Sequence, residues 1–203
     1  MSILVLASIL VIGASYALGS INSAIVVCRL MGLTDPRQYG SGNPGATNVL
    51  RQGGRRGQIA AATTLLGDIL KGWLPVVAAT GGGLPLGVVA GAGIAAFLGH
   101  LYPLFFGFRG GKGVATAFGV VAGLSPFTAL LVVASWGLVF AITRVSALAA
   151  LVAAALAPLY ALGLGMPSIL WGSLLAMVAL VVWRHRTNIQ RLRQGQEGRI
   201  GGS

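Results

Sequence analysis

The chain has 203 residues, of which 56% are hydrophobic and only 8% are charged, and its mean hydropathy is +0.86. This composition excludes an ordinary soluble domain and predicts an all-α polytopic membrane protein with a single domain over residues 1–203. Fourteen Lys and Arg against three acidic residues give a formal net charge of +11, which suits cytoplasmic loops, anionic lipid headgroups or a phosphorylated substrate.

The first hydrophobic segment, at about 3–27, has no positively charged residue in front of it. Because a cleaved signal peptide carries such residues, we expect this segment to be the first membrane span. Cys28, the single cysteine, lies in an apolar run at the end of this segment. One cysteine excludes an intramolecular disulfide and a metal site built from several thiolates.

Further hydrophobic segments have the roughly 17–25 residues that a bilayer crossing requires. They lie at about 57–80, 84–106, 126–143, 146–163 and 167–184, with a shorter segment at about 113–124. Turn sequences such as TGGGLP and GMP separate them. The pattern predicts about seven transmembrane helices, with the short segment either a full span or a half-buried one.

The positive charges favour one orientation of these seven segments. Thirteen of the fourteen Lys and Arg then lie on the same side, whereas merging 113–143 into one span would separate Arg144 and the tail from the earlier cations. Since cytoplasmic loops carry the excess of Lys and Arg, we expect the N-terminus outside and the C-terminus in the cytoplasm. The exception is Lys71, within the second segment.

The first cytoplasmic loop contains the polar, glycine-rich sequence YGSGNPGATNVLRQGGRR at 39–56. Its match to G-x-G-x-x-G is weak because no strand precedes it, so a dinucleotide site is not expected. Hydroxyl, amide and guanidinium groups together can hold the hydroxyls and phosphate oxygens of a ligand. The candidates are Ser41, Gly42, Asn43, Thr47, Asn48 and Arg51. The alternative is a capped loop that only leads into the second span.

The third loop contains GHLYPLFFGFRGGKGVAT at 99–116, in which three glycines surround Lys112. Such a segment can turn its N–H groups inward as an anion-binding nest, and a following helix would add its dipole. The Walker A pattern does not fit, because Phe106 and Gly113 stand where glycine and Ser or Thr are needed. The prediction is phosphate binding without nucleotide hydrolysis, by Gly110, Gly111, Lys112, Gly113 and Thr116. A tight turn with one topogenic lysine is the alternative.

The tail carries a further group of polar residues. His185, Asn188 and Arg191 are three residues apart, so a helix would place them roughly on one face. Histidine titrates near neutral pH. Glu197, the nearest carboxylate, is expected to pair with Arg193 or to fix the tail.

Asp68 and Lys71 are three residues apart in an otherwise apolar segment. An ion buried in a bilayer needs a partner, so we expect an ion pair that faces the bundle interior. A role near substrate is the alternative. His100, at the end of the third segment, is expected to be a hydrogen-bonded structural residue rather than a base.

Taken together, SGNPGATN at 41–48, GHLYPLFFGFRGGKGVAT at 99–116 and HRTNIQRLRQGQE at 185–197 resemble the three cytoplasmic motifs of the PlsY-type membrane acyltransferases. That family uses acyl phosphate to acylate glycerol 3-phosphate, and the resemblance covers essentially the whole chain. It implies a bacterial inner-membrane enzyme of phospholipid synthesis that makes 1-acyl-glycerol 3-phosphate and inorganic phosphate, with its active site on the cytoplasmic side.

The same resemblance implies roles for individual residues. It places the glycerol 3-phosphate site at Gly110, Gly111, Lys112 and Gly113. Active-site or phosphate-binding positions carry over to Ser41, Asn43, Arg51, His185 and Asn188, and a residue important for integrity carries over to Glu197. The proton acceptor stays open between His185 and a phosphate oxygen of a substrate.

The chemistry of this reaction agrees with the residues. The H-x-x-x-x-D pair of other acyltransferases is absent, since Phe105 and Gln190 stand at the corresponding positions after the two histidines. An acyl phosphate is already activated, so the glycerol hydroxyl can attack it directly, without an acyl-enzyme, a cofactor or a metal. Catalysis would rest on positioning and on neutralising phosphate charge, for which Lys112 and Arg51 are favoured.

The expected partners are acyl phosphate, glycerol 3-phosphate and membrane lipids, with no nucleic acid, and the chain is expected to act as a monomer. The main alternative is a transporter for a phosphorylated solute. A transporter would carry polar groups along both halves of its pathway, but the segments on the outer side have almost none.

Overall fold

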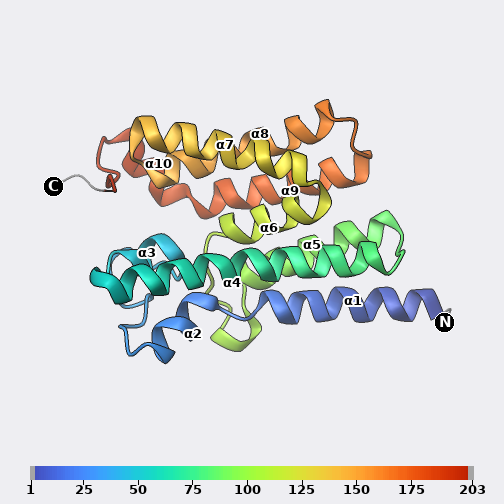
Figure 1. Cartoon of the computed structure of the whole chain (residues 1–203), viewed down its shortest axis with the longest axis horizontal. Helices are drawn as coiled ribbons and strands as arrows, with labels where there is room; N and C mark the ends of the chain where they lie inside the picture. The colour runs from blue at the N-terminus through green and yellow to red at the C-terminus, as the bar shows by residue number, and fades with distance from the viewer. Residues whose placement is uncertain (1–2, 201–203) are drawn as a thin grey trace. The chain divides into compact units, whose positions relative to one another are not determined.

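The computed structural model describes residues 3–200 and is helical over most of that range, with no strand in it (Figure 1). The α-helices are α1 (Ile3–Gly19), α2 (Ser23–Leu30), α3 (Ala46–Leu50), α4 (Gly54–Gly81), α5 (Leu86–Leu101), α6 (Val114–Leu124), α7 (Pro126–Thr143), α8 (Ser146–Gly163), α9 (Ser168–Arg184) and α10 (Arg186–Arg193). A short 3-10 helix, η1 (Leu104–Phe106), follows α5. The predicted all-α class is confirmed.

Four helical segments of the described range are long and apolar enough to cross a membrane: α4, α5 with η1, α7 and α8. Two bent pairs raise the number to six if each pair is one span, namely α1 with α2, bent by 45°, and α9 with α10, bent by 59°. The short helix α6 has 11 residues. Each predicted segment thus corresponds to helix, while the crossing of α6 and the orientation in the membrane stay predictions.

The chain divides after Gly123 into two compact units, which are described separately. Unit 1 ends with most of α6, and unit 2 begins at Leu124.

In unit 1, α4 is the longest helix, and α1 and α5 pack along it (Figure 1). Small residues allow α1 and α5 to pack closely against each other, since a side chain at Gly19 or Gly99 would collide with the backbone of the facing helix. On α5, Ala92, Ala96 and Phe97 are fully buried. The helices α2 and α3 pack against α4, and the polar loop of residues 31–45 connects them.

The predicted first span, 3–27, is not one continuous helix. The chain leaves the helix after Gly19. Asn22 is the N-cap of α2, and its Oδ1 accepts a hydrogen bond from the Ile25 amide at 3.1 Å. Asparagine at this position competes with the helix for backbone hydrogen bonds, which explains the break inside an apolar sequence. The Ile21 carbonyl at the break accepts a hydrogen bond from Lys71 Nζ at 2.8 Å.

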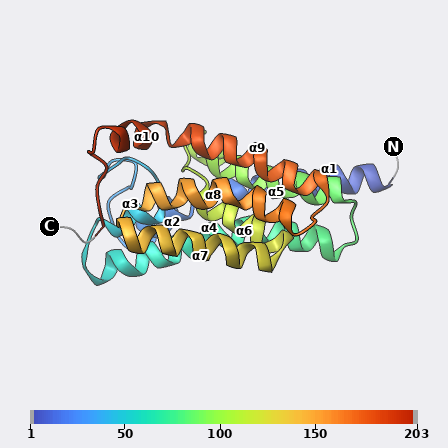
Figure 2. The ribbon, with the colours of Figure 1, turned by 90° about the horizontal axis from the view of Figure 1, so that it is seen from above.

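In unit 2, α7, α8 and α9 run side by side (Figures 1 and 2). The buried face of α8 consists mostly of alanine, at positions 149, 150, 153, 157 and 161. Ser125 caps α7, and the hydroxyls of Ser135 and Tyr160 join α7 to α8 at 2.7 Å. After α9, the chain bends at His185 into α10.

Candidate active site

The loop that carries the first motif is shaped by the side chain of Asn48, which is only 2% exposed. Its Nδ2 donates to the carbonyls of Pro36 at 2.8 Å and Tyr39 at 2.9 Å. Its Oδ1 accepts from the Ser41 amide at 2.9 Å. The structure therefore places Asn48, which the sequence predicts as a substrate-binding residue, beneath the loop as its internal support.

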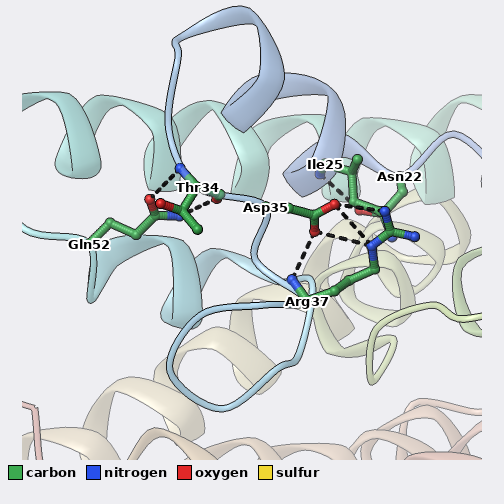
Figure 3. A network of polar contacts seen from close by, with 6 residues as sticks. All are labelled: Asn22, Ile25, Thr34, Asp35, Arg37 and Gln52. Atoms are coloured by element: carbon green, nitrogen blue, oxygen red, sulfur yellow. Dashed lines mark hydrogen bonds and ion pairs between the residues drawn. The ribbon is translucent and has the colours of Figure 1, made fainter.

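Two further contacts fix the first part of this loop (Figure 3). Gln52 makes a paired contact with the backbone of Thr34, accepting from its amide at 3.0 Å and donating to its carbonyl at 2.9 Å. Asp35 forms an ion pair with Arg37, with 2.6 Å between Oδ2 and Nη2. The hydrogen bonds from Arg37 hold the pKa of the Asp35 carboxyl below its ordinary value. Sequence reasoning missed both contacts, because neither follows from a motif.

The remaining candidates of the first motif lie at the surface of unit 1. Ser41, Gly42, Thr47 and Arg51 are exposed, and Asn43 is half-buried. The backbone oxygen of Arg51 accepts a hydrogen bond from the Tyr39 hydroxyl at 3.0 Å, which ties α3 to the loop. The exposed hydroxyl and guanidinium groups thus lie on the loop and on α3, and the side chain of Asn48 supports the loop from inside.

The second motif returns to the end of α5 after the η1 turn. The amide of Gly110 donates to the Leu101 carbonyl and the amide of Gly111 to the His100 carbonyl, both at 3.2 Å. These two N–H groups are directed at the end of α5, and phosphate binding by Gly110 and Gly111 stays a prediction. The amides that follow them, at Lys112 and Gly113, lead directly into the N-terminus of α6.

The glycines of this motif are required by close packing. A Cβ at Gly110 would collide with the backbone oxygens of His100 and Leu101. A Cβ at Gly111 would meet the His100 ring and would lie 3.1 Å from the Pro44 carbonyl oxygen of the first motif. Gly113 has a φ of +84°, which a residue with a side chain rarely adopts. The structure therefore brings the first and second motifs into contact at Gly111, next to the half-buried Lys112.

Thr116 lies in the first turn of α6 and is fully buried. Its backbone packs against Gly72 of α4, where any side chain on Gly72 would collide with the Thr116 carbonyl. The predicted ligand-binding position is thus part of the α4–α6 contact.

Asp68, Lys71 and His100 form a buried polar cluster in unit 1. Lys71 Nζ lies 2.8 Å from Asp68 Oδ1, and His100 Nδ1 lies 3.5 Å from the same oxygen. The three side chains are at most 5% exposed. The structure confirms the predicted Asp68–Lys71 ion pair in the interior of the helices.

The third motif lies in unit 2, at the bend between α9 and α10. His185 is 3% exposed, and its Nδ1 is 2.8 Å from the Val181 carbonyl. Because a carbonyl oxygen only accepts hydrogen bonds, Nδ1 carries the proton and the neutral ring has its lone pair on Nε2. The bend thus fixes both the orientation and the tautomer of His185.

Glu197 holds the tail against α10. Its Oε1 accepts from Asn188 Nδ2 at 2.6 Å, and its Oε2 lies 3.0 Å from Arg191 Nε. The predicted partner Arg193 was wrong, because the chain turns after α10 and brings the carboxylate back toward the face that carries Asn188 and Arg191. The prediction that Glu197 fixes the tail agrees with these contacts.

Within residues 3–200, no group of three or more His, Cys, Asp or Glu side chains could hold a metal ion. The polar groups of the first two motifs are instead hydroxyls, a guanidinium and an ammonium, which are suited to anionic ligands.

Comparison with known proteins identifies the family to which these motifs belong. Residues 9–195 match the model of the family described as glycerol-3-phosphate acyltransferase. A glycerol-3-phosphate acyltransferase of Thioalkalivibrio sulfidiphilus is 54% identical over 198 residues, which cover 98% of this chain and 96% of the relative. One from Hydrogenovibrio crunogenus is 53% identical, over 93% of this chain and 90% of the relative.

Two crystal structures of PlsY (YgiH), described as an integral membrane glycerol 3-phosphate acyltransferase, are similar to this chain. The glycerol 3-phosphate form has a TM-score of 0.91 and 40% identity over 96% of each chain. The lysophosphatidic acid form has a TM-score of 0.89 and 39% identity over the same shares. The resemblance predicted from the three motifs is confirmed, and the chain belongs to the family of integral membrane glycerol-3-phosphate acyltransferases.

Proposed function

We propose that the chain transfers a fatty acyl group from acyl phosphate to the 1-hydroxyl of sn-glycerol 3-phosphate. The products are 1-acyl-sn-glycerol 3-phosphate (lysophosphatidate) and inorganic phosphate. Its family makes the chain a glycerol-3-phosphate acyltransferase, so the acyl donor and the residue roles are the new parts of the proposal. The two similar PlsY structures are described as a glycerol 3-phosphate form and a lysophosphatidic acid form. These molecules are the acceptor and a product of the proposed reaction, which supports the proposal.

The observation that carries the proposal is the contact between the first two motifs in unit 1. Gly111 lies against the Pro44 carbonyl, and Lys112 follows it directly. The exposed Ser41 belongs to the same loop as Pro44, and the exposed Arg51, at the end of α3, has its side chain beside Gly40 of that loop. A lysine, an arginine and a hydroxyl on adjoining loops can hold a phosphate while leaving the rest of the substrate open to attack.

The reaction needs two anionic substrates bound with their reacting groups next to each other. Oxygen O1 of glycerol 3-phosphate attacks the acyl carbonyl carbon, and the bond from that carbon to the phosphate oxygen breaks. The phosphate leaves with the bonding electrons, and the proton of O1 passes to a phosphate oxygen of a substrate. Lys112 and Arg51 neutralise the charge of the phosphate groups.

The proposed setting is a bacterial inner membrane, with all three motifs on the cytoplasmic side and a monomer as the active form. In this setting the acyl chain of the donor lies in the bilayer, and the soluble acceptor arrives from the cytoplasm. This arrangement explains why exposed apolar side chains cover α1 and α7, while the motifs lie in loops and at a helix bend.

The test uses the purified full chain in lipid nanodiscs with labelled glycerol 3-phosphate. Acyl phosphate, acyl-CoA and acyl carrier protein thioester are supplied in separate reactions, and lysophosphatidate and phosphate are measured. We expect product with equimolar phosphate from acyl phosphate alone. Product formed from a thioester without acyl phosphate would overturn the proposed donor.

A matched pair of variants tests the phosphate role of Lys112. Lys112→Ala should lower kcat/KM for glycerol 3-phosphate by about a hundredfold or more, because it removes a cation from the anionic substrate. Arg55→Ala removes an exposed cation outside the proposed site and should leave kcat/KM unchanged. Equal losses in both variants would contradict the assignment.

A further inference from the structure

The buried cluster of Asp68, Lys71 and His100 joins four separate parts of unit 1. Asp68 and Lys71 lie on α4, and His100 lies at the end of α5. Lys71 also donates to the Ile21 carbonyl at the break between α1 and α2. Through His100, the cluster reaches the glycine segment of the second motif.

Charge balance alone accounts for only part of this cluster. The carboxylate of Asp68 neutralises Lys71 within α4, and a buried pair needs such neutralisation. The same Oδ1 also lies 3.5 Å from His100 Nδ1, on another helix. A pair that served only for neutrality would not need a ring from α5 beside it. The contact between Asp68 and His100 therefore needs another explanation.

His100 contacts Gly111 in two ways. Its carbonyl accepts the hydrogen bond of the Gly111 amide at 3.2 Å. Its ring lies against Gly111 with the Nε2 and Cε1 edge, so closely that a Cβ on Gly111 could not fit. Nδ1 of the ring therefore faces Asp68, and the adjoining Cε1–Nε2 edge faces the backbone that leads to Lys112.

We propose that Asp68 and His100 are positioning residues that fix the backbone at Gly111, and through it Lys112, for the phosphate of glycerol 3-phosphate. Asp68 sets the orientation of the imidazole ring, and the ring supports the segment from the side of α5. This proposal rests on the proposed function, since it assumes that the segment binds the acceptor substrate. It assigns Asp68 and His100 no contact with the reacting atoms.

The decisive variant separates the two tasks of Asp68. Asp68→Leu with Lys71→Leu removes both charges together, and an apolar pair of similar size is tolerated at a buried site. Neutrality is kept, but His100 loses its partner. We expect KM for glycerol 3-phosphate to rise about tenfold or more, with KM for acyl phosphate within about twofold of the unaltered chain, because only the acceptor segment is displaced.

His100→Phe provides an independent variant, because it keeps a ring of similar shape without nitrogen atoms. It should show the same selective rise in KM for glycerol 3-phosphate. Thr64→Val is the matched control: Thr64 is fully buried one turn from Asp68 on α4, and its hydroxyl has no hydrogen-bond partner. Both KM values of this control should stay unchanged.

The results distinguish the possible failures. If the unaltered chain makes no lysophosphatidate, the proposed function fails. If it is active and the double variant has an unchanged KM for glycerol 3-phosphate, the cluster serves only charge balance and the positioning role is overturned. A loss that affects both substrates equally, together with a lower melting temperature, also overturns it. A rise confined to glycerol 3-phosphate in either variant supports it.

Discussion

The first and second motifs reach a fixed loop shape by opposite means. The first loop depends on one buried side chain, Asn48, which bonds three backbone groups between residues 36 and 41. The second motif depends on the lack of side chains at Gly110 and Gly111, which lets the backbone bond to the end of α5. Removing a side chain should therefore harm the first motif, and adding one should harm the second.

The largest effect on activity is expected when a methyl group is added to the second motif. Gly110→Ala places a Cβ against two backbone carbonyls that cannot move aside, and such overpacking costs about 1–3 kcal/mol. Displacement of Lys112 should also lower kcat/KM by about a hundredfold. Steady-state kinetics and thermal unfolding check both effects. Gly13→Ala, where a Cβ meets no atom within 4 Å, should change neither.

Removal of the Asn48 side chain should break the first loop. Asn48→Ala deletes three hydrogen bonds and leaves buried backbone groups unpaired, which should cost about 2–4 kcal/mol and lower the melting temperature by several degrees. Asn48→Asp keeps the acceptor for the Ser41 amide and loses both donors. It should unfold at a temperature between the other two. Identical melting of all three proteins would contradict the support role of Asn48.

The third motif should respond more weakly than either loop. Glu197→Gln keeps an oxygen that can accept from Asn188 but removes the ion pair with Arg191, whose side chain is 43% exposed. An ion pair whose arginine is open to solvent is worth about 1 kcal/mol, so the melting temperature should fall only slightly. Glu197→Leu removes both contacts and should have a clearly larger effect. A large loss in the glutamine variant would show that the charge itself is needed.

The smallest effect is expected from the exposed Asp35–Arg37 pair of the first loop. Arg37 lowers the pKa of Asp35, so the pair stabilises the folded chain above the ordinary carboxyl pKa, near 4. This contribution disappears as the pH falls through the lowered pKa of the folded state. The stability difference between the unaltered chain and Asp35→Asn should thus be present at pH 7 and decline below about pH 4. A difference independent of pH would refute the contribution.

The sequence predicts the local features of this protein well. Hydrophobic segments correspond to helices because apolar length is a property of one stretch of chain. The Asp68–Lys71 pair was predictable because residues three apart on a helix are neighbours. The three motifs indicated the family, since each is a long, ordered pattern.

Contacts between distant segments were not predictable in the same way. The amides of Gly110 and Gly111 bond to α5 because the chain folds back after η1, and no spacing rule reveals that return. Glu197 meets Arg191 instead of Arg193 for a similar reason, since the chain leaves the helix before the carboxylate. An asparagine in a polar loop can bind a ligand or support the loop, and the sequence does not distinguish the two roles. Only the burial of Asn48 reveals that it supports the loop.

The placement of the Asp68–Lys71 pair on one helix has a consequence for membrane insertion. A lone charge raises the cost of moving a helix from the translocation machinery into lipid, and this cost arises before other helices can offer a partner. Because both charges lie on neighbouring turns of α4, the helix can enter lipid with its own counter-ion. The contacts with Ile21 and His100 are then added when α1 and α5 pack against it.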